Sequence, residues 1–251
     1  MSLLVSFRSE TLKLKRTLLL YLCVLAAMFG PFMTFIEYIN WRGEPHAPRP
    51  WVSFFIKARE PLSIALLPLY VILVCTLLLQ IEYRDKTWKQ LLASPQKMID
   101  IFLAKFITLQ LMILAFIFGY NLFLAIAAFG IEAMRPELYG GGIDYYWLWA
   151  VNVQAYLMIL GVSAIQFWLS FQFKHFMAPL AIGFGLWLLG PMMVFEFHWD
   201  IVKQYPYAFT MLSRLSKYQV NIVPYQWYSI VTALLFLTLG FIGFRIRKVR
   251  S

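Results

Sequence analysis

The chain alternates long apolar stretches with short polar segments, and six of the stretches are long enough to cross a bilayer as helices. They are Thr17–Ile39, Pro61–Ile81, Ile99–Phe129, Tyr146–Phe171, Phe176–Phe195 and Trp227–Phe244. Each is close to or above the ~20 residues that a helix needs to span the hydrocarbon core. The pattern predicts an all-α, polytopic membrane protein whose residues 1–251 form a single transmembrane domain.

The composition supports this class of protein. Hydrophobic residues make up 61% of the chain and charged residues 14%, whereas about a quarter of the residues of a soluble domain are charged. A net charge of +10 on a soluble surface would suggest nucleic acid as a partner. In a membrane protein the same charge reports topology first, so we expect no nucleic-acid partner.

An even number of spans puts both termini on one side of the membrane, and basic residues gather on that side. They are Arg8, Lys13, Lys15, Arg16, Arg84, Lys86, Lys89, Lys97, Lys105, Lys174, Arg245, Arg247, Lys248 and Arg250. Since cytoplasmic segments accumulate Lys and Arg, we expect cytoplasmic termini in a protein of the inner (plasma) membrane. The third span is longer than a bilayer requires, which predicts that its Lys105 end projects into water.

The segment before the first span predicts an amphipathic helix over residues 2–16. Leu3, Leu4, Phe7, Thr11 and Leu14 recur at helical spacing, while the charged residues fall largely on other faces. Such a helix lies on the inner membrane surface, and its candidate interfacial residues are Phe7, Glu10, Lys13 and Arg16. The alternative is a disordered basic N-terminus.

A polar segment, Glu82–Pro95, separates the second and third spans. Glu82 stands four residues before Lys86, and this acid-first spacing supports an exposed helix. Trp88 and Leu91 share one side of that helix. We therefore interpret the segment as a helix that offers an aromatic side chain to a partner; the alternative is an ordinary solvated loop.

The sequence holds no recognisable catalytic or metal motif. A P-loop and an H-E-x-x-H pattern are absent, and His46, His175 and His198 lie in different loops. Cys23 and Cys75 fall inside apolar stretches, which disfavours a disulfide or a metal site. We expect neither an enzyme nor a bound cofactor.

Charged residues are also missing from the middle of the predicted spans, which disfavours a proton-coupled pump or a channel with a charged filter. Uncharged polar residues do occur there. We expect these to bond across neighbouring helices rather than to contact a substrate: Gln80, Gln110, Asn121, Asn152, Gln154 and Gln166.

Two segments carry a resemblance to a known family. The N-terminus reads Ser9-Glu-Thr-Leu-Lys-Leu-Lys-Arg16, and the segment between spans two and three contains Glu82, Thr87, Leu91 and Ser94-Pro95. With the six-span layout, they resemble the ABC-2-type permeases of ATP-binding-cassette exporters, especially the small permeases of bacitracin-resistance and lantibiotic-immunity systems. The glycine that often precedes the threonine in that segment is Lys86 here.

The resemblance implies that Glu82–Ala93 is a coupling helix that docks on a separate cytoplasmic ABC ATPase, which binds ATP and Mg²⁺. Its implied contact residues are Glu82, Arg84, Lys86, Thr87, Trp88, Lys89 and Leu91. The further partners implied are a second permease copy or a similar permease, membrane lipid, and an amphipathic cargo such as a peptide antibiotic, a lantibiotic or a lipid-like molecule. Alternatives are a non-transporting scaffold or sensor subunit and, with less support from the sequence, a membrane-embedded lipid-modifying enzyme.

Overall fold

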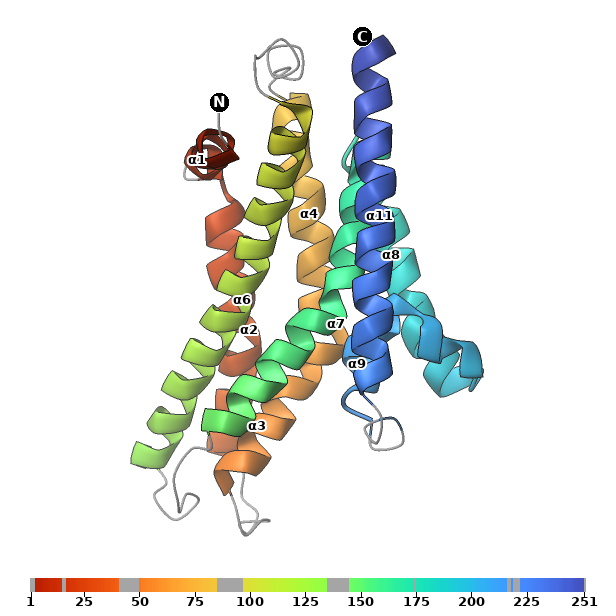
Figure 1. Ribbon diagram of the computed structural model, residues 1–251. Helices are drawn as coiled ribbons and strands as arrows, with labels where there is room; N and C mark the ends of the chain where they lie inside the picture. The colour runs from red at the N-terminus through yellow and green to blue at the C-terminus, as the bar shows by residue number, and fades with distance from the viewer. Residues whose placement is uncertain are drawn as a thin grey trace.

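The computed structural model describes residues 3–14, 17–40, 50–84, 97–134, 145–173, 175–215, 218 and 222–250. Every regular element in these ranges is helical, and six helices are long and apolar enough to cross a membrane. The predicted all-α class with six spans is therefore confirmed. Both termini lie at the same end of the bundle, at the top of Figure 1; we call this the terminal end.

The described helices follow the predicted order, with bounds that differ by a few residues at most ends. They are α1 (Leu3–Leu14), α2 (Leu19–Asn40), α3 (Pro50–Pro61), the π-helix η1 (Leu62–Leu66), α4 (Leu67–Arg84), α6 (Met98–Met134), α7 (Tyr145–Gln172), α8 (Met177–Pro191), the π-helix η3 (Met192–Glu196), the 3₁₀ helices η4 (Asp200–Gln204) and η5 (Pro206–Ala208), α9 (Phe209–Leu212) and α11 (Val223–Arg250). Helix α6 extends to Met134, beyond the predicted end at Phe129.

The second span is longer than the sequence analysis predicts. Helices α3, η1 and α4 follow one another without a break, and the apolar helical stretch begins at Phe54 rather than at Pro61. Proline inside a helix lacks an N–H and crowds the carbonyl of the residue four before it. A π-helical turn follows Pro61 directly, as another follows Pro191 in the fifth span. The helix thus accommodates Pro61 by a local π-turn, and the prediction that a new helix starts at Pro61 is wrong.

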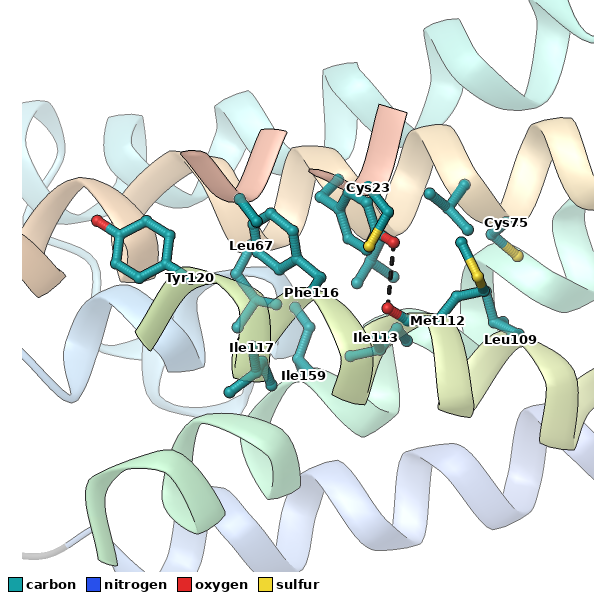
Figure 2. Packing of buried hydrophobic residues seen from close by; sticks show 14 of the residues in the cluster. Cys23, Leu67, Cys75, Leu109, Met112, Ile113, Phe116, Ile117, Tyr120 and Ile159 are labelled. Atoms are coloured by element: carbon teal, nitrogen blue, oxygen red, sulfur yellow. Dashed lines mark hydrogen bonds between the residues drawn. The ribbon is translucent and has the colours of Figure 1, made fainter. Parts of the chain in front are cut away.

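The helices pack as two groups that share a core. Helix α6 packs chiefly against α2 and α1, whereas α7 packs chiefly against α11 and α4. Phe116 of α6 stacks on Tyr70 of α4, with ring centroids 4.1 Å apart, and the Tyr70 hydroxyl donates to the Met112 carbonyl. Figure 2 shows this core, in which Leu67, Phe116 and Ile159 bring α4, α6 and α7 together.

The short helices after α8 form a second, smaller core. Phe209, Met211 and Leu212 are buried there with Val202 of η4, and Phe209 stacks on Tyr225 at the start of α11. This segment brings Arg214 to the second span, where its Nε donates to Ser63 Oγ over 3.2 Å. A residue of the segment between α8 and α11 thus meets the π-turn that follows Pro61.

Candidate functional site

The residues predicted to couple the chain to a partner lie mostly outside the described residues. Glu82 and Arg84 belong to the last turn of α4, but Lys86, Thr87, Trp88, Lys89 and Leu91 lie outside the described ranges. Helix α4 ends and helix α6 begins at the terminal end of the bundle (Figure 1). The described helices therefore locate the two ends of the segment, and the coupling helix itself stays a prediction.

The predicted N-terminal helix is present as α1 over Leu3–Leu14, and residues 2, 15 and 16 of the predicted range lie outside the described residues. Phe7 is half-buried, and Arg16 lies outside the described residues. The residues that α1 buries are Ser6, Glu10 and Leu14, whereas Leu4 is 73% exposed. The side of α1 that faces the bundle is thus more polar than the predicted apolar face, because it places Glu10 against α6.

Glu10 is the centre of an ion cluster between α1 and α6. Its Oε1 accepts from Lys13 Nζ over 2.7 Å, and its Oε2 accepts from Lys105 Nζ over 3.1 Å. Burial alone would raise the pKa of this carboxyl, but the charges and hydrogen bonds of Lys105 and Lys13 outweigh burial and lower the pKa of Glu10 below its usual 4.5. The carboxylate is therefore ionised at neutral pH, and it joins the N-terminal helix to the start of the third span.

The position of Lys105 corrects one prediction. The length of the third span predicts that this end projects into water, whereas Lys105 is fully buried and ion-paired with Glu10. Helix α1 covers this part of α6, so the lysine is shielded by protein and neutralised by a carboxylate. Length and hydropathy alone do not reveal this contact, because the two residues lie far apart in the sequence.

Polar side chains link the helices at several depths of the bundle, as the sequence analysis predicts for four of its amides. Gln110 of α6 donates to Ser163 Oγ of α7 over 3.0 Å, and Gln166 of α7 donates to the Pro179 carbonyl over 2.8 Å. Further along α6, Asn121 Nδ2 donates to Asn152 Oδ1 of α7 over 3.0 Å. Such bonds are worth about 0.6 kcal/mol each on average in membrane proteins, and they fix the helix register.

Arg59 is an interior residue that sequence reasoning misses. Its Nη1 donates to Asn121 Oδ1 and its Nη2 donates to Asn152 Oδ1, both over 2.8 Å. The residue is 0% exposed. The prediction that the spans hold no interior charge is wrong here, because the second span begins at Phe54 and includes Arg59. Pro50 carries the signal that could have found it, since proline is typical of the first turn of a helix.

We call Arg59, Asn121 and Asn152 the amide–arginine cluster. It joins α3, α6 and α7, and the neighbouring Tyr120 hydroxyl bonds to the Ala58 carbonyl of α3. Within the described parts of the chain, no group of three or more His, Cys, Asp or Glu residues is placed to hold a metal ion. The amide–arginine cluster suits the binding of charged groups and the joining of helices.

Comparison with known proteins places these features in a family. Residues 6–190 match the model of a family described as ABC-2 family transporter protein. The matched region includes most of α1, the segment after α4 and the amide–arginine cluster. No curated protein matches the sequence significantly.

Proposed function

This chain belongs to the ABC-2 transporter family, as a membrane permease component that has no ATPase activity of its own, and we propose that it exports an amphipathic or hydrophobic compound. Peptide antibiotics, lantibiotics and lipid-like molecules are the cargo classes that we propose. ABC-2 permeases generally pair with an ABC ATPase. That partner would bind ATP and Mg²⁺ and supply the energy for transport.

The proposed topology puts both termini and the segment 82–96 in the cytoplasm. The distribution of Lys and Arg supports it, since basic residues cluster around the termini and around the segment between α4 and α6. In this orientation the ATPase would meet the terminal end of the bundle. The opposite end, where α3 begins, would face the outside.

The observation that best supports coupling at the terminal end is the ion cluster of Glu10. It ties α1 to Lys105, only a few residues after α6 begins and close to the proposed coupling segment. A force applied to the segment 82–96 would therefore reach α1 and α6 together. A loose N-terminal helix could not transmit such a force, because nothing would fix it to the span.

The proposed working unit contains two permeases, which are either identical copies or two similar chains. Large apolar side chains on the outer faces of α2 and α11 are well exposed in the single chain, among them Leu25 at 62% and Leu234 at 61%. Lipid or a second permease would cover such faces in a membrane. Both kinds of contact are compatible with the proposal.

The test is a Trp88→Ala substitution in the proposed coupling segment. A buried aromatic anchor at an interface often contributes about 2 kcal/mol or more, which is roughly 30-fold in affinity. We expect the variant to enter the membrane normally but to lose co-purification with an ABC ATPase and any ATPase stimulation. The measurements are pull-down from detergent-solubilised membranes and hydrolysis assays in the presence of candidate cargo.

Trp149→Ala is the matched control, because Trp149 is 69% exposed on the first turns of α7, at the other end of the bundle. It should leave the ATPase bound. Normal ATPase binding and transport in the Trp88 variant would rule out this coupling site. Capture of a regulatory protein in place of an ATPase would instead support a scaffold or sensor subunit.

A further inference from the structure

The amide–arginine cluster holds a buried positive charge with neutral partners. The two hydrogen bonds of Arg59 end on the amide oxygens of Asn121 and Asn152, and its Nε is buried without a hydrogen-bond partner. None of the ion pairs among the described residues includes Arg59. A buried ion without a counter-charge costs several kcal/mol, so the site favours the arrival of an anion.

A second arginine increases this preference. Arg214 bonds to Ser63, which lies four residues after Arg59 on the same helix, and it is close enough to repel Arg59 electrostatically. The exposed Glu60 attracts Arg214 electrostatically. The two guanidinium groups thus leave an excess of positive charge at the inner side of this helix, where Arg59 is buried.

The chemistry of the cluster also matches an anion. A guanidinium is planar and presents paired N–H donors that fit a carboxylate or a phosphate in a bidentate fashion. Both asparagines can turn their amide nitrogens toward a bound oxyanion, since each carries two donors as well as the oxygen that now accepts from Arg59. Three side chains from three helices would then share one anionic group.

The surroundings of the cluster indicate what the anion is attached to. Tyr120 and Ile117, on the same turns of α6 as Asn121, belong to the hydrophobic core shown in Figure 2. A small hydrated ion would give up its water for the polar contacts of the cluster alone and would gain nothing from the apolar core. An anionic head group on an apolar body would place its charge on Arg59 and its apolar part against the core.

We infer that Arg59, Asn121 and Asn152 form a binding site for the phosphate or carboxylate group of an amphiphilic cargo. The inference rests on the proposed export function, because it takes the bound compound to be the exported cargo. It narrows the proposed cargo from amphipathic compounds to anionic amphipathic compounds. The site is closed in this structure, because Arg59 is fully buried. The anion would enter when α6 and α7 separate, and it would replace the bond between Asn121 and Asn152 that now joins them.

The test measures the thermal unfolding of the purified chain in dodecyl maltoside with added dodecyl phosphate as the anionic amphiphile. At about 100-fold its Kd, a bound ligand should raise the unfolding midpoint of a chain of this size by roughly 5 °C. We expect this shift in the wild type and its loss in Arg59→Gln. Arg8→Gln is the matched control, because Arg8 is exposed on α1, and it should keep the shift.

A second variant keeps the test decisive if Arg59→Gln does not fold. Asn152→Asp places a permanent carboxylate at the oxygen that already accepts from Arg59, so it should fold and no longer respond to dodecyl phosphate. Inorganic phosphate alone should give no shift. Exchange of phosphatidylcholine for phosphatidylglycerol in nanodiscs should also leave the midpoint nearly unchanged.

Four results would overturn the inference: no shift in the wild type, a full shift in Asn152→Asp, an equal shift with inorganic phosphate, or a large shift from phosphatidylglycerol. The third would indicate a site for small anions, and the fourth a site for a resident lipid. None of these measurements needs the ATPase. Their failure is therefore separate from that of the Trp88 experiment, which tests the proposed function itself.

Discussion

Lys105 and Arg59 are both fully buried cations that bond to a residue of another helix, yet their partners differ. Lys105 meets the carboxylate of Glu10 over 3.1 Å, while Arg59 meets the amide oxygens of Asn121 and Asn152 over 2.8 Å. The first site is neutralised, and Lys13 adds a further positive charge at its edge. The second site keeps an uncompensated charge among neutral groups.

This difference separates two roles for buried charge. A buried ion pair with well-placed hydrogen bonds holds two helices together. Removing one partner lowers the free energy of unfolding by about 3–5 kcal/mol. A charge held by amides is less well compensated and gains stability from a ligand of opposite sign. We therefore expect the ion pair between Glu10 and Lys105 to persist during transport. The hydrogen bonds of the amide–arginine cluster, in contrast, should be exchanged for bonds to a ligand.

The largest expected effect on stability comes from giving Lys105 an amide partner, like the partners of Arg59, in place of the carboxylate of Glu10. Glu10→Gln keeps an oxygen that can accept from Lys105 but removes the negative charge. We expect a loss of about 3 kcal/mol in the free energy of unfolding, because the buried Lys105 loses the carboxylate of Glu10. Equilibrium unfolding in mixed micelles at neutral pH measures this loss.

Two controls separate charge from shape at this site. Lys13→Gln should cost less than about 1 kcal/mol, because the Lys13 side chain is 31% exposed. The double variant Glu10→Met with Lys105→Met should recover most of the loss, since apolar residues can replace a buried pair at little cost. A loss in Lys13→Gln as large as that in Glu10→Gln would show that Lys105 is not the important partner.

The two sites also differ in how much of each can be predicted from the sequence. The amphipathic helix, with Glu10 and Lys13, and the polar residues Asn121 and Asn152 follow from spacing and hydropathy. The contact between Glu10 and Lys105 does not, because a one-dimensional pattern contains no information on which helix covers α6. That contact depends on the tertiary packing of α1.

Sequence reasoning misses Arg59 for a different reason, which is local. Pro61 is predicted to start a span, but a π-turn accommodates this proline and the helix runs on from Pro50. Arg59 consequently enters the bundle instead of an outer loop. The six spans are predictable because each depends on a long apolar stretch, whereas one misplaced helix start is enough to hide the amide–arginine cluster.

The second prediction makes the amide–arginine cluster resemble the Glu10 site. Asn152→Asp supplies Arg59 with a carboxylate and gives up the bond from Asn152 Nδ2 to the Leu148 carbonyl. The bond from Arg59 to this side chain exists already, so the gain is the opposite charge of the carboxylate, which we expect to outweigh the neutral bond that is lost. We expect the free energy of unfolding to rise by about 1 kcal/mol, measured in the same micelles.

The matched control for this prediction is Gln110→Glu, which adds an acid to α6 at a neutral contact with Ser163. That variant should lower the free energy of unfolding, since the buried carboxylate would lack a cation. Destabilisation by Asn152→Asp would mean that Arg59 is already well compensated, and the contrast between the two sites would disappear.

The smallest effect near neutral pH is the titration of Glu10, in which acid removes the negative charge from the wild-type side chain. The folded state lowers the pKa of Glu10 below its usual 4.5, so its contribution to stability is fully present above that value and is lost as pH falls through the folded pKa. Protonated Glu10 resembles glutamine in shape and charge.

We therefore expect the difference in free energy of unfolding between the wild type and Glu10→Gln to be constant from about pH 8 to pH 5 and to decrease below about pH 4.5. Unfolding midpoints of both proteins across this range measure it, and a difference that persists undiminished at about pH 3 would show that Glu10 acts through packing rather than through its charge.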